Sequence, residues 1–143
     1  MNLTKPETLD GYINAKTKTE VEATKHITIE NLPPLLILHL KRFVFDNIGG
    51  IQKLHKFVEY PLVLDLQDEL LSTTMEKPPK YQLYAVAYHH GTATTGGHYT
   101  CDVLHATGGW FRIDDTNVTE IAPQKVVEEK ADRVAYLLFY KSM

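Results

Sequence analysis

The stretches YQLYAVAYHH (residues 81–90) and RVAYLLFY (residues 133–140) decide the fold that we predict from this sequence. Both are rich in aromatic and aliphatic side chains, which favour strands. In both stretches the two alternating faces are largely apolar, and a strand of that kind is usually covered on both sides. We therefore predict that these two segments are the central strands of a β-sheet.

Three further segments are predicted to be strands because they share this composition. They are LLILHLKRFVF (residues 35–45), GHYTCDVL (residues 97–104) and WFRID (residues 110–114). Residues 35–45 follow two prolines and are too few for a helix of ordinary length. Residues 54–66 predict a short extended piece that is broken at Pro61.

The rest of the chain is predicted to consist of loops, one short helix and an exposed first segment. Residues 123–131 favour a helix, because Pro123 suits a first turn. Residues 47–50 and 72–80 are predicted loops. Residues 1–25, rich in Thr, Lys and Glu, are expected to be exposed or poorly ordered, as a solvated segment or a hairpin. The predicted fold class is α+β with a mainly antiparallel β-sheet.

Length, charge and cysteine usage narrow the classes of protein. The 143 residues suit a single compact unit, and a formal net charge of −3 gives no basic field for nucleic acid. The longest apolar run is too short to span a membrane. A single cysteine, Cys101, excludes an internal disulfide framework, so we expect a reducing compartment, the cytoplasm with the nucleus as an alternative.

A hairpin of residues 97–104 and 110–114 would bring a histidine and a carboxylate together. If Leu104 faces Trp110, His98 lies diagonally from Asp114 on the same face of the sheet. Diagonal neighbours are roughly 7–8 Å apart at the backbone, a gap that the two side chains can close. In this register Asp115 and Cys101 would point to the opposite face, whereas a one-residue slip would exchange Asp114 for Asp115.

A histidine oriented by a carboxylate is the general-base half of a nucleophilic site. Gly96 and Gly97 leave the backbone before His98 bare, which would allow an extended substrate to approach closely. No metal site is predicted, because the sequence has neither an HExxH motif nor a CxxC pair. No cofactor is expected either.

Four ordered motifs resemble the carboxyl-terminal boxes of the ubiquitin-specific proteases. They are LPPLLILHLKRF (residues 32–43), YAVAYHHGTATTGGHYTCDV (residues 84–103), WFRIDD (residues 110–115) and AYLLFY (residues 135–140). The resemblance implies that residues 1–143 are the carboxyl-terminal part of one papain-like catalytic domain, forming its palm and part of its fingers. It also implies a thiol-dependent deubiquitinase that cleaves isopeptide or peptide bonds after the terminal Gly-Gly of ubiquitin.

The same resemblance implies roles for individual residues. His98 would be the general base, Asp114 its orienting partner and Asp115 a neighbouring acid. The tail of ubiquitin would be bound by a larger set of residues. These are Arg42, Phe43, His90, Gly91, Gly96, Gly97 and Tyr99.

The chain departs from the family pattern in three ways. It has no amino-terminal cysteine box, no glutamine-and-aspartate box and no CxxC pairs for a fingertip zinc. We therefore expect a fragment that is inactive alone and needs the missing amino-terminal half of the catalytic domain. Ubiquitin and ubiquitinated proteins are the expected partners. The alternative is a catalytically incomplete module that binds ubiquitin or acts as an adaptor.

Overall fold

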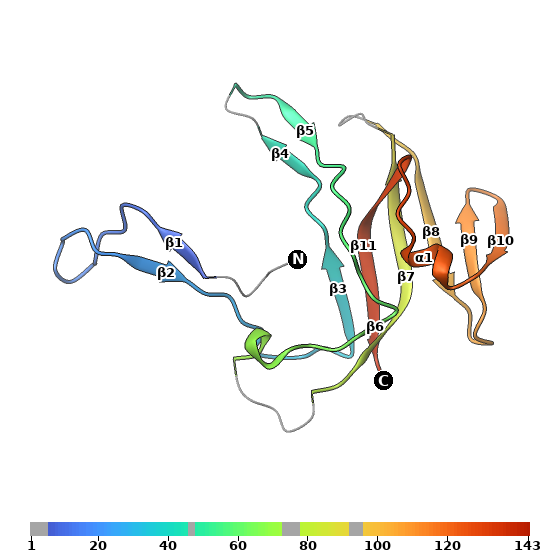
Figure 1. The fold of residues 1–143 in the computed structure, drawn as a ribbon, viewed down its shortest axis with the longest axis horizontal. Helices are drawn as coiled ribbons and strands as arrows, with labels where there is room; N and C mark the ends of the chain where they lie inside the picture. Colours follow the sequence, from blue (N-terminus) through green and yellow to red (C-terminus); the bar gives the residue numbers. More distant parts are fainter. Residues whose placement is uncertain (1–5, 46–47, 73–77, 92–95) are drawn as a thin grey trace. The chain divides into compact units, whose positions relative to one another are not determined.

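The computed structural model of the chain describes residues 6–45, 48–72, 78–91 and 96–143 (Figure 1). The described residues form two compact units. The smaller unit draws on residues 1–32 and 66–78, and the larger on residues 33–65 and 79–143. Every residue to which a site role was assigned lies in the larger unit.

The described residues of the larger unit form a seven-stranded sheet in which every pairing is antiparallel. Its strands are β3 (Leu35–His39), β6 (Val63–Leu64), β7 (Tyr81–His90), β8 (Tyr99–Leu104), β9 (Trp110–Asp114), β10 (Asn117–Ile121) and β11 (Arg133–Ser142). The order is β10-β9-β8-β7-β11-β3, with β6 paired to β7 off this path. The predicted mainly antiparallel sheet is confirmed.

Strands β7 and β11 lie at the centre of the sheet, as their apolar sequences predict (Figure 1). Their buried side chains include Leu83, Val86 and Leu138, each at most 2% exposed. A register irregularity at Phe139 and Tyr140 keeps Leu83 and Val86 buried although they are an odd number of residues apart. The side chains between them are only half-buried, so one face of these strands is covered more fully than the other.

Residues 35–45 do not form the single strand that was predicted. Strand β3 ends at His39, and β4 (Phe43–Phe45) pairs with β5 (Ile51–Lys53) in a separate two-stranded sheet. The buried Arg42 lies at the break, where its Nε donates to the carbonyl oxygen of Ala135 at 2.9 Å. The guanidinium thus satisfies backbone acceptors where the chain passes from one sheet to the other. No glycine or proline indicates this break in the sequence.

The other predicted elements differ mainly in length. Helix α1 spans Gln124–Val127 and is shorter than the predicted residues 123–131, whereas β10 was not predicted. Residues 54–66 contribute only β6. Of the two predicted loops, residues 47 and 73–77 lie outside the described residues, and the remaining positions hold no helix or strand.

The smaller unit contains an exposed hairpin and one turn of 3-10 helix. Strand β1 (Glu7–Leu9) pairs with β2 (Ala23–Lys25), which confirms the hairpin alternative for the first segment. The 3-10 helix η1 spans Asp68–Leu70, and the backbone N–H of Ile29 donates to the carbonyl of Leu70 at 2.7 Å. Among the described residues of the chain, no helix has the length and apolar character needed to cross a membrane.

Candidate functional site

The hairpin of β8 and β9 has the predicted register and brings His98 against Asp114. Leu104 pairs with Trp110, and Cys101 pairs with Ile113. His98 Nε2 lies 2.5 Å from Asp114 Oδ1, and about half of each side chain remains exposed. Nδ1 of His98 has no hydrogen-bond partner among the described residues. The geometric prediction for this pair is confirmed, and one ring nitrogen remains available to a reacting group.

Asp115 lies closer to His98 than predicted. The expected opposite orientation is wrong, because the ligand atoms of His98, Asp114 and Asp115 all lie within 4.8 Å of one another. Asp115 has a φ of 52°, in the left-handed region, so the alternation of a regular strand ends at Asp114. One nitrogen and two carboxylates at this spacing could hold a cation, although an exposed acidic pair of this kind needs none.

Both acids raise the pKa of His98. The hydrogen bond that His98 donates to Asp114 raises the pKa of His98. Desolvation opposes this rise, and the charges of Asp114 and Asp115 add to it. A carboxylate stabilises the imidazolium form and fixes which nitrogen carries the proton. His98 is therefore oriented and made more basic by its neighbours.

Titration of His98 should show this effect directly. We expect Asp114→Asn to lower the pKa of His98 measured by NMR, because the hydrogen-bonded anion is lost. Since the folded pKa is raised, the pair stabilises the fold fully below pH 6.5, and this contribution is lost as the pH rises through the folded pKa. The stability difference between the wild-type chain and Asp114→Asn should therefore shrink with rising pH. An unchanged His98 pKa in Asp114→Asn would contradict the assignment.

His90 lies beside His98 on the neighbouring strand. Its ring centroid is 5.5 Å from that of His98, and its Nε2 is hydrogen-bonded to Oγ1 of Thr100 at 2.8 Å. Desolvation lowers the pKa of His90, which favours the neutral ring. Gly91 follows with a φ of 79° and turns the chain out of β7. His90 therefore lies beside His98, and the predicted contact of His90 and Gly91 with the ubiquitin tail stays a prediction.

His89 is a site neighbour to which the sequence analysis assigned no role. It is 2% exposed, and its Nδ1 has no hydrogen-bond partner among the described residues. A Cβ built on Gly97 would lie 2.1 Å from Nε2 of His89, so the ring occupies the space beside this glycine. On this side Gly97 makes room for His89 rather than for a substrate, whereas a Cβ on Gly96 would meet nothing within 4 Å.

Aromatic rings and a lysine surround His89. Tyr99, which is 54% exposed, has its ring centroid 4.8 Å from that of His89, and Phe43 lies at 6.0 Å. Lys53 of β5 contacts the carbonyl oxygens of His89, at 3.4 Å, and Gly91. Lys53 was also missed by the sequence analysis, because nothing in its local sequence indicates that β5 lies beside the end of β7.

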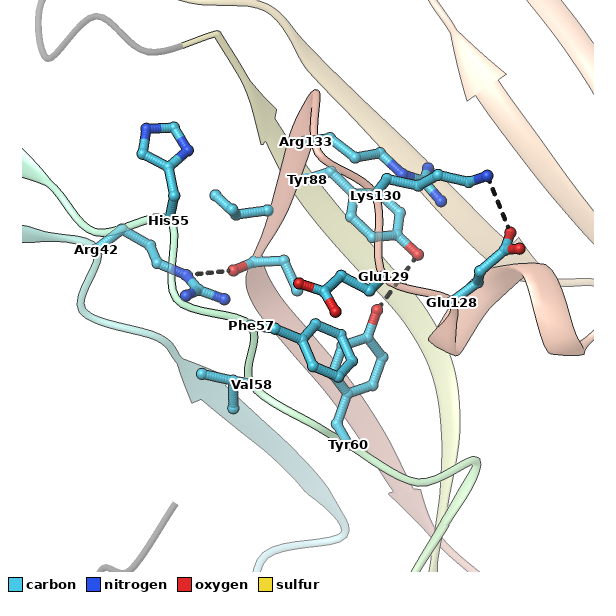
Figure 2. A pocket seen from close by; sticks show the side chains of 12 residues that line it. Arg42, His55, Phe57, Val58, Tyr60, Tyr88, Glu128, Glu129, Lys130 and Arg133 are labelled. Atoms are coloured by element: carbon cyan, nitrogen blue, oxygen red, sulfur yellow. Dashed lines mark hydrogen bonds and ion pairs between the residues drawn. The ribbon is translucent and has the colours of Figure 1, made fainter.

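Arg42 is a buried residue and not a surface charge. It is 3% exposed, its guanidinium also contacts the carbonyl oxygen of Lys56, and burial lowers its pKa. Figure 2 shows Arg42 at a small pocket that Tyr60, Tyr88 and Arg133 also line. Arg42 and Phe43, both predicted to bind the tail, therefore differ: the ring of Phe43 lies near His89, whereas the donors of Arg42 serve backbone carbonyl oxygens.

Cys101 is half-buried, and burial raises the pKa of its thiol, which disfavours the reactive thiolate. It lies three residues from His98 on an extended strand, so the alternation of side chains directs it to the opposite face. These properties do not suit a nucleophile for His98.

A scan against protein families matches residues 4–140 to the family described as ubiquitin carboxyl-terminal hydrolase. The chain belongs to this family. Rat ubiquitin carboxyl-terminal hydrolase 10 is 50% identical over 94% of the chain, and probable ubiquitin carboxyl-terminal hydrolase 3 of Schizosaccharomyces pombe is 43% identical over 97%. The chain spans 18% and 30% of these two relatives, respectively. The predicted resemblance to the ubiquitin-specific proteases is confirmed, and the chain is similar to hydrolase 10 in particular.

Solved structures of this hydrolase family share the fold. A structure of the yeast SAGA deubiquitinating module matches 99% of the chain and 31% of its own, at 32% identity and a TM-score of 0.84. A SAGA deubiquitinating module bound to monoubiquitin matches the same shares at 31% identity and a TM-score of 0.82. The chain thus shares the fold of the corresponding part of these deubiquitinase structures, which is consistent with the papain-like fold that its motifs predicted.

Proposed function

We propose that this chain supplies the general base of a thiol-dependent deubiquitinase. In this proposal His98 accepts the proton of a cysteine thiol, and Asp114 holds the imidazole through Nε2 so that Nδ1 faces the thiol. The thiolate attacks the carbonyl carbon of the bond after ubiquitin's terminal glycine. His98 then returns the proton to the leaving amine, and water releases ubiquitin from the enzyme thioester.

The observation that supports this proposal most is the 2.5 Å contact between His98 Nε2 and Asp114 Oδ1. An exposed His-carboxylate pair with one free ring nitrogen has the geometry of a base and its orienting acid. Family membership indicates which substrate such a base would serve. We propose that residues 1–143 are the carboxyl-terminal part of one catalytic domain, and that the nucleophilic cysteine lies in a segment outside them.

We propose that the substrate tail runs past Gly96, shortly before His98. Gly96 has open space where a Cβ would be, and Tyr99, which follows His98 in the sequence, has a half-exposed ring. His90 lies beside this stretch, since its backbone N–H donates to the carbonyl oxygen of His98 at 2.8 Å. A glycine at this point suits a peptide that ends in Gly-Gly, because two backbones without side chains can approach closely.

Reconstitution tests the proposal. The chain would be co-expressed with the amino-terminal half of the catalytic domain of rat ubiquitin carboxyl-terminal hydrolase 10, and cleavage of a ubiquitin conjugate would be measured. We expect cleavage by the assembly, none by the 143-residue chain alone, and full activity when Cys101→Ser is introduced as the control. Loss of activity in Cys101→Ser would overturn the assignment of the nucleophile.

The alternative function is binding without cleavage, which the unsuitability of Cys101 as a nucleophile favours. One of the two similar structures described above is bound to monoubiquitin. Ubiquitin binding can therefore be tested with this chain alone. Titration of labelled ubiquitin into the isolated chain would show saturable binding if the chain acts as an adaptor. Binding without any cleavage after addition of the cysteine-bearing half would favour this alternative over the enzyme.

A further inference from the structure

A buried carboxylate lies on the same hairpin as the proposed base. Asp102 of β8 is 0% exposed. Arg112 of β9 holds it with two hydrogen bonds, from Nε to Oδ1 and from Nη2 to Oδ2, both 2.8 Å long. The planar guanidinium matches both carboxylate oxygens, so this contact fixes direction as well as distance. A charge taken this far out of water must remain paired, which makes loss of the contact costly.

The central strands hold the same carboxylate from a second side. The hydroxyl of Tyr88, on β7, lies 2.8 Å from Oδ2 of Asp102, and Nη1 of Arg133, on β11, lies 3.8 Å from it. The guanidinium of Arg133 also stacks 3.8 Å above the ring of Tyr88. Besides the backbone pairing of β7 with β8, the side chain of Asp102 therefore links the β8–β9 hairpin to side chains of β7 and β11.

The Asp102–Arg112 pair lies on the same hairpin as the His98–Asp114 pair. Asp102 and Arg112 are direct cross-strand partners. Asp102 lies four residues after His98 and Arg112 lies two residues before Asp114, so alternation places all four side chains on one face of the hairpin. The buried Asp102–Arg112 contact and the exposed His98–Asp114 contact thus lie along one face and share one register.

We propose that Asp102 and Arg112 are positioning residues that keep Asp114, and not Asp115, hydrogen-bonded to His98. A one-residue slip of β9 against β8 would turn Arg112 to the other face. Asp102 would then lose the pair of hydrogen bonds from the guanidinium of Arg112, which we call the fork. The fork therefore opposes the slip that would exchange the two adjacent acids. The inference rests on the proposed function only in naming His98 as the base, since the effect on geometry is independent of catalysis.

The test follows the titration of His98 by NMR in the full 143-residue chain. Arg112→Gln removes a positive charge, which by charge alone would raise the pKa of His98. The positioning account predicts the opposite, because Asp114 would no longer be held against the ring. We expect the His98 pKa to fall in Arg112→Gln and in Asp102→Asn, toward the value in Asp114→Asn. A raised or unchanged His98 pKa in a folded Arg112→Gln chain would overturn the proposal.

Two further variants keep the test decisive. Arg112→Lys keeps a cation beside Asp102 but lacks the fork, so it should fold and still show a lowered His98 pKa. Lys80→Gln removes an exposed cation that pairs with Asp65 at 3.0 Å in the same unit. This control should leave the pKa of His98 unchanged. Amide shifts of β7 and β11 would report whether each variant keeps the central sheet.

Activity of the reconstituted enzyme separates this inference from the proposed function. We expect Arg112→Lys to lower kcat/KM on the order of 10- to 100-fold, because small misplacement of a catalytic group costs rates of this size. If His98 is essential but Arg112→Lys changes neither titration nor rate, only the positioning role fails. If the titration shifts as expected while His98→Ala stays active, only the catalytic role fails.

Discussion

Replacement of Gly97 by alanine is expected to disrupt the site almost completely. The new Cβ would lie 2.1 Å from Nε2 of His89, and the φ of 148° at this position is one that residues with a Cβ rarely adopt. His89 is buried against the rings of Tyr99 and Phe43, so either its ring or the backbone before His98 must move. Denaturant unfolding should show a loss on the order of 1–3 kcal/mol, and the reconstituted enzyme should lose nearly all activity.

A suppressor variant and a control make this prediction specific. Gly97→Ala combined with His89→Ala should recover part of the stability, because the smaller side chain removes the clash. Gly108→Ala is the matched control, since Gly108 also has a positive φ, 95°, but an added Cβ would meet no atom within 4 Å. Equal losses in Gly97→Ala and Gly108→Ala would show that backbone strain, and not contact with His89, explains the effect.

Replacement of His98 by alanine should have the largest effect on catalysis. A general base of this kind contributes on the order of 10²–10⁴-fold, so kcat/KM for a ubiquitin conjugate should fall by about that factor. Asp114→Asn should lower kcat/KM nearly as much, because the hydrogen bond to Nε2 orients the ring. Asp115→Asn should cost less, since Asp115 acts on His98 through its charge alone.

The control for this series is His105→Ala. His105 lies at the turn of the same hairpin, and within the described residues its side chain is hydrogen-bonded only to Thr107, so loss of the ring should leave kcat/KM unchanged. A larger loss in Asp115→Asn than in Asp114→Asn would contradict the assigned orienting acid.

The hairpin that forms the site could be predicted because local pattern determines it. Two apolar strands joined by a short turn have few registers that bury Trp110 and keep the polar ends exposed. Once Leu104 faces Trp110, the position of Asp114 relative to His98 follows from strand geometry. The central place of β7 and β11 was predictable for a related reason, since their sequences lack a polar face.

The remaining features depend on contacts that are distant in sequence. Arg42 is buried at the break between β3 and β4 because it reaches Ala135, which is 93 residues away. The proximity of His89 to Gly97 and of Lys53 to Gly91 likewise requires the tertiary fold. Asp115 was placed on the wrong side because its left-handed φ cannot be read from an Asp-Asp-Thr sequence.

The reactivity of the incoming cysteine tests the central claim most directly. The amino-terminal half of hydrolase 10 would be alkylated with iodoacetamide at neutral pH, alone and after addition of this chain with Cys101→Ser, so that no thiol of this chain reacts. The account predicts that the chain accelerates alkylation of the catalytic cysteine, and that His98→Ala abolishes the acceleration, because the adjacent imidazole favours the thiolate, which is the reactive form. Equal acceleration by the His98→Ala chain would contradict the account.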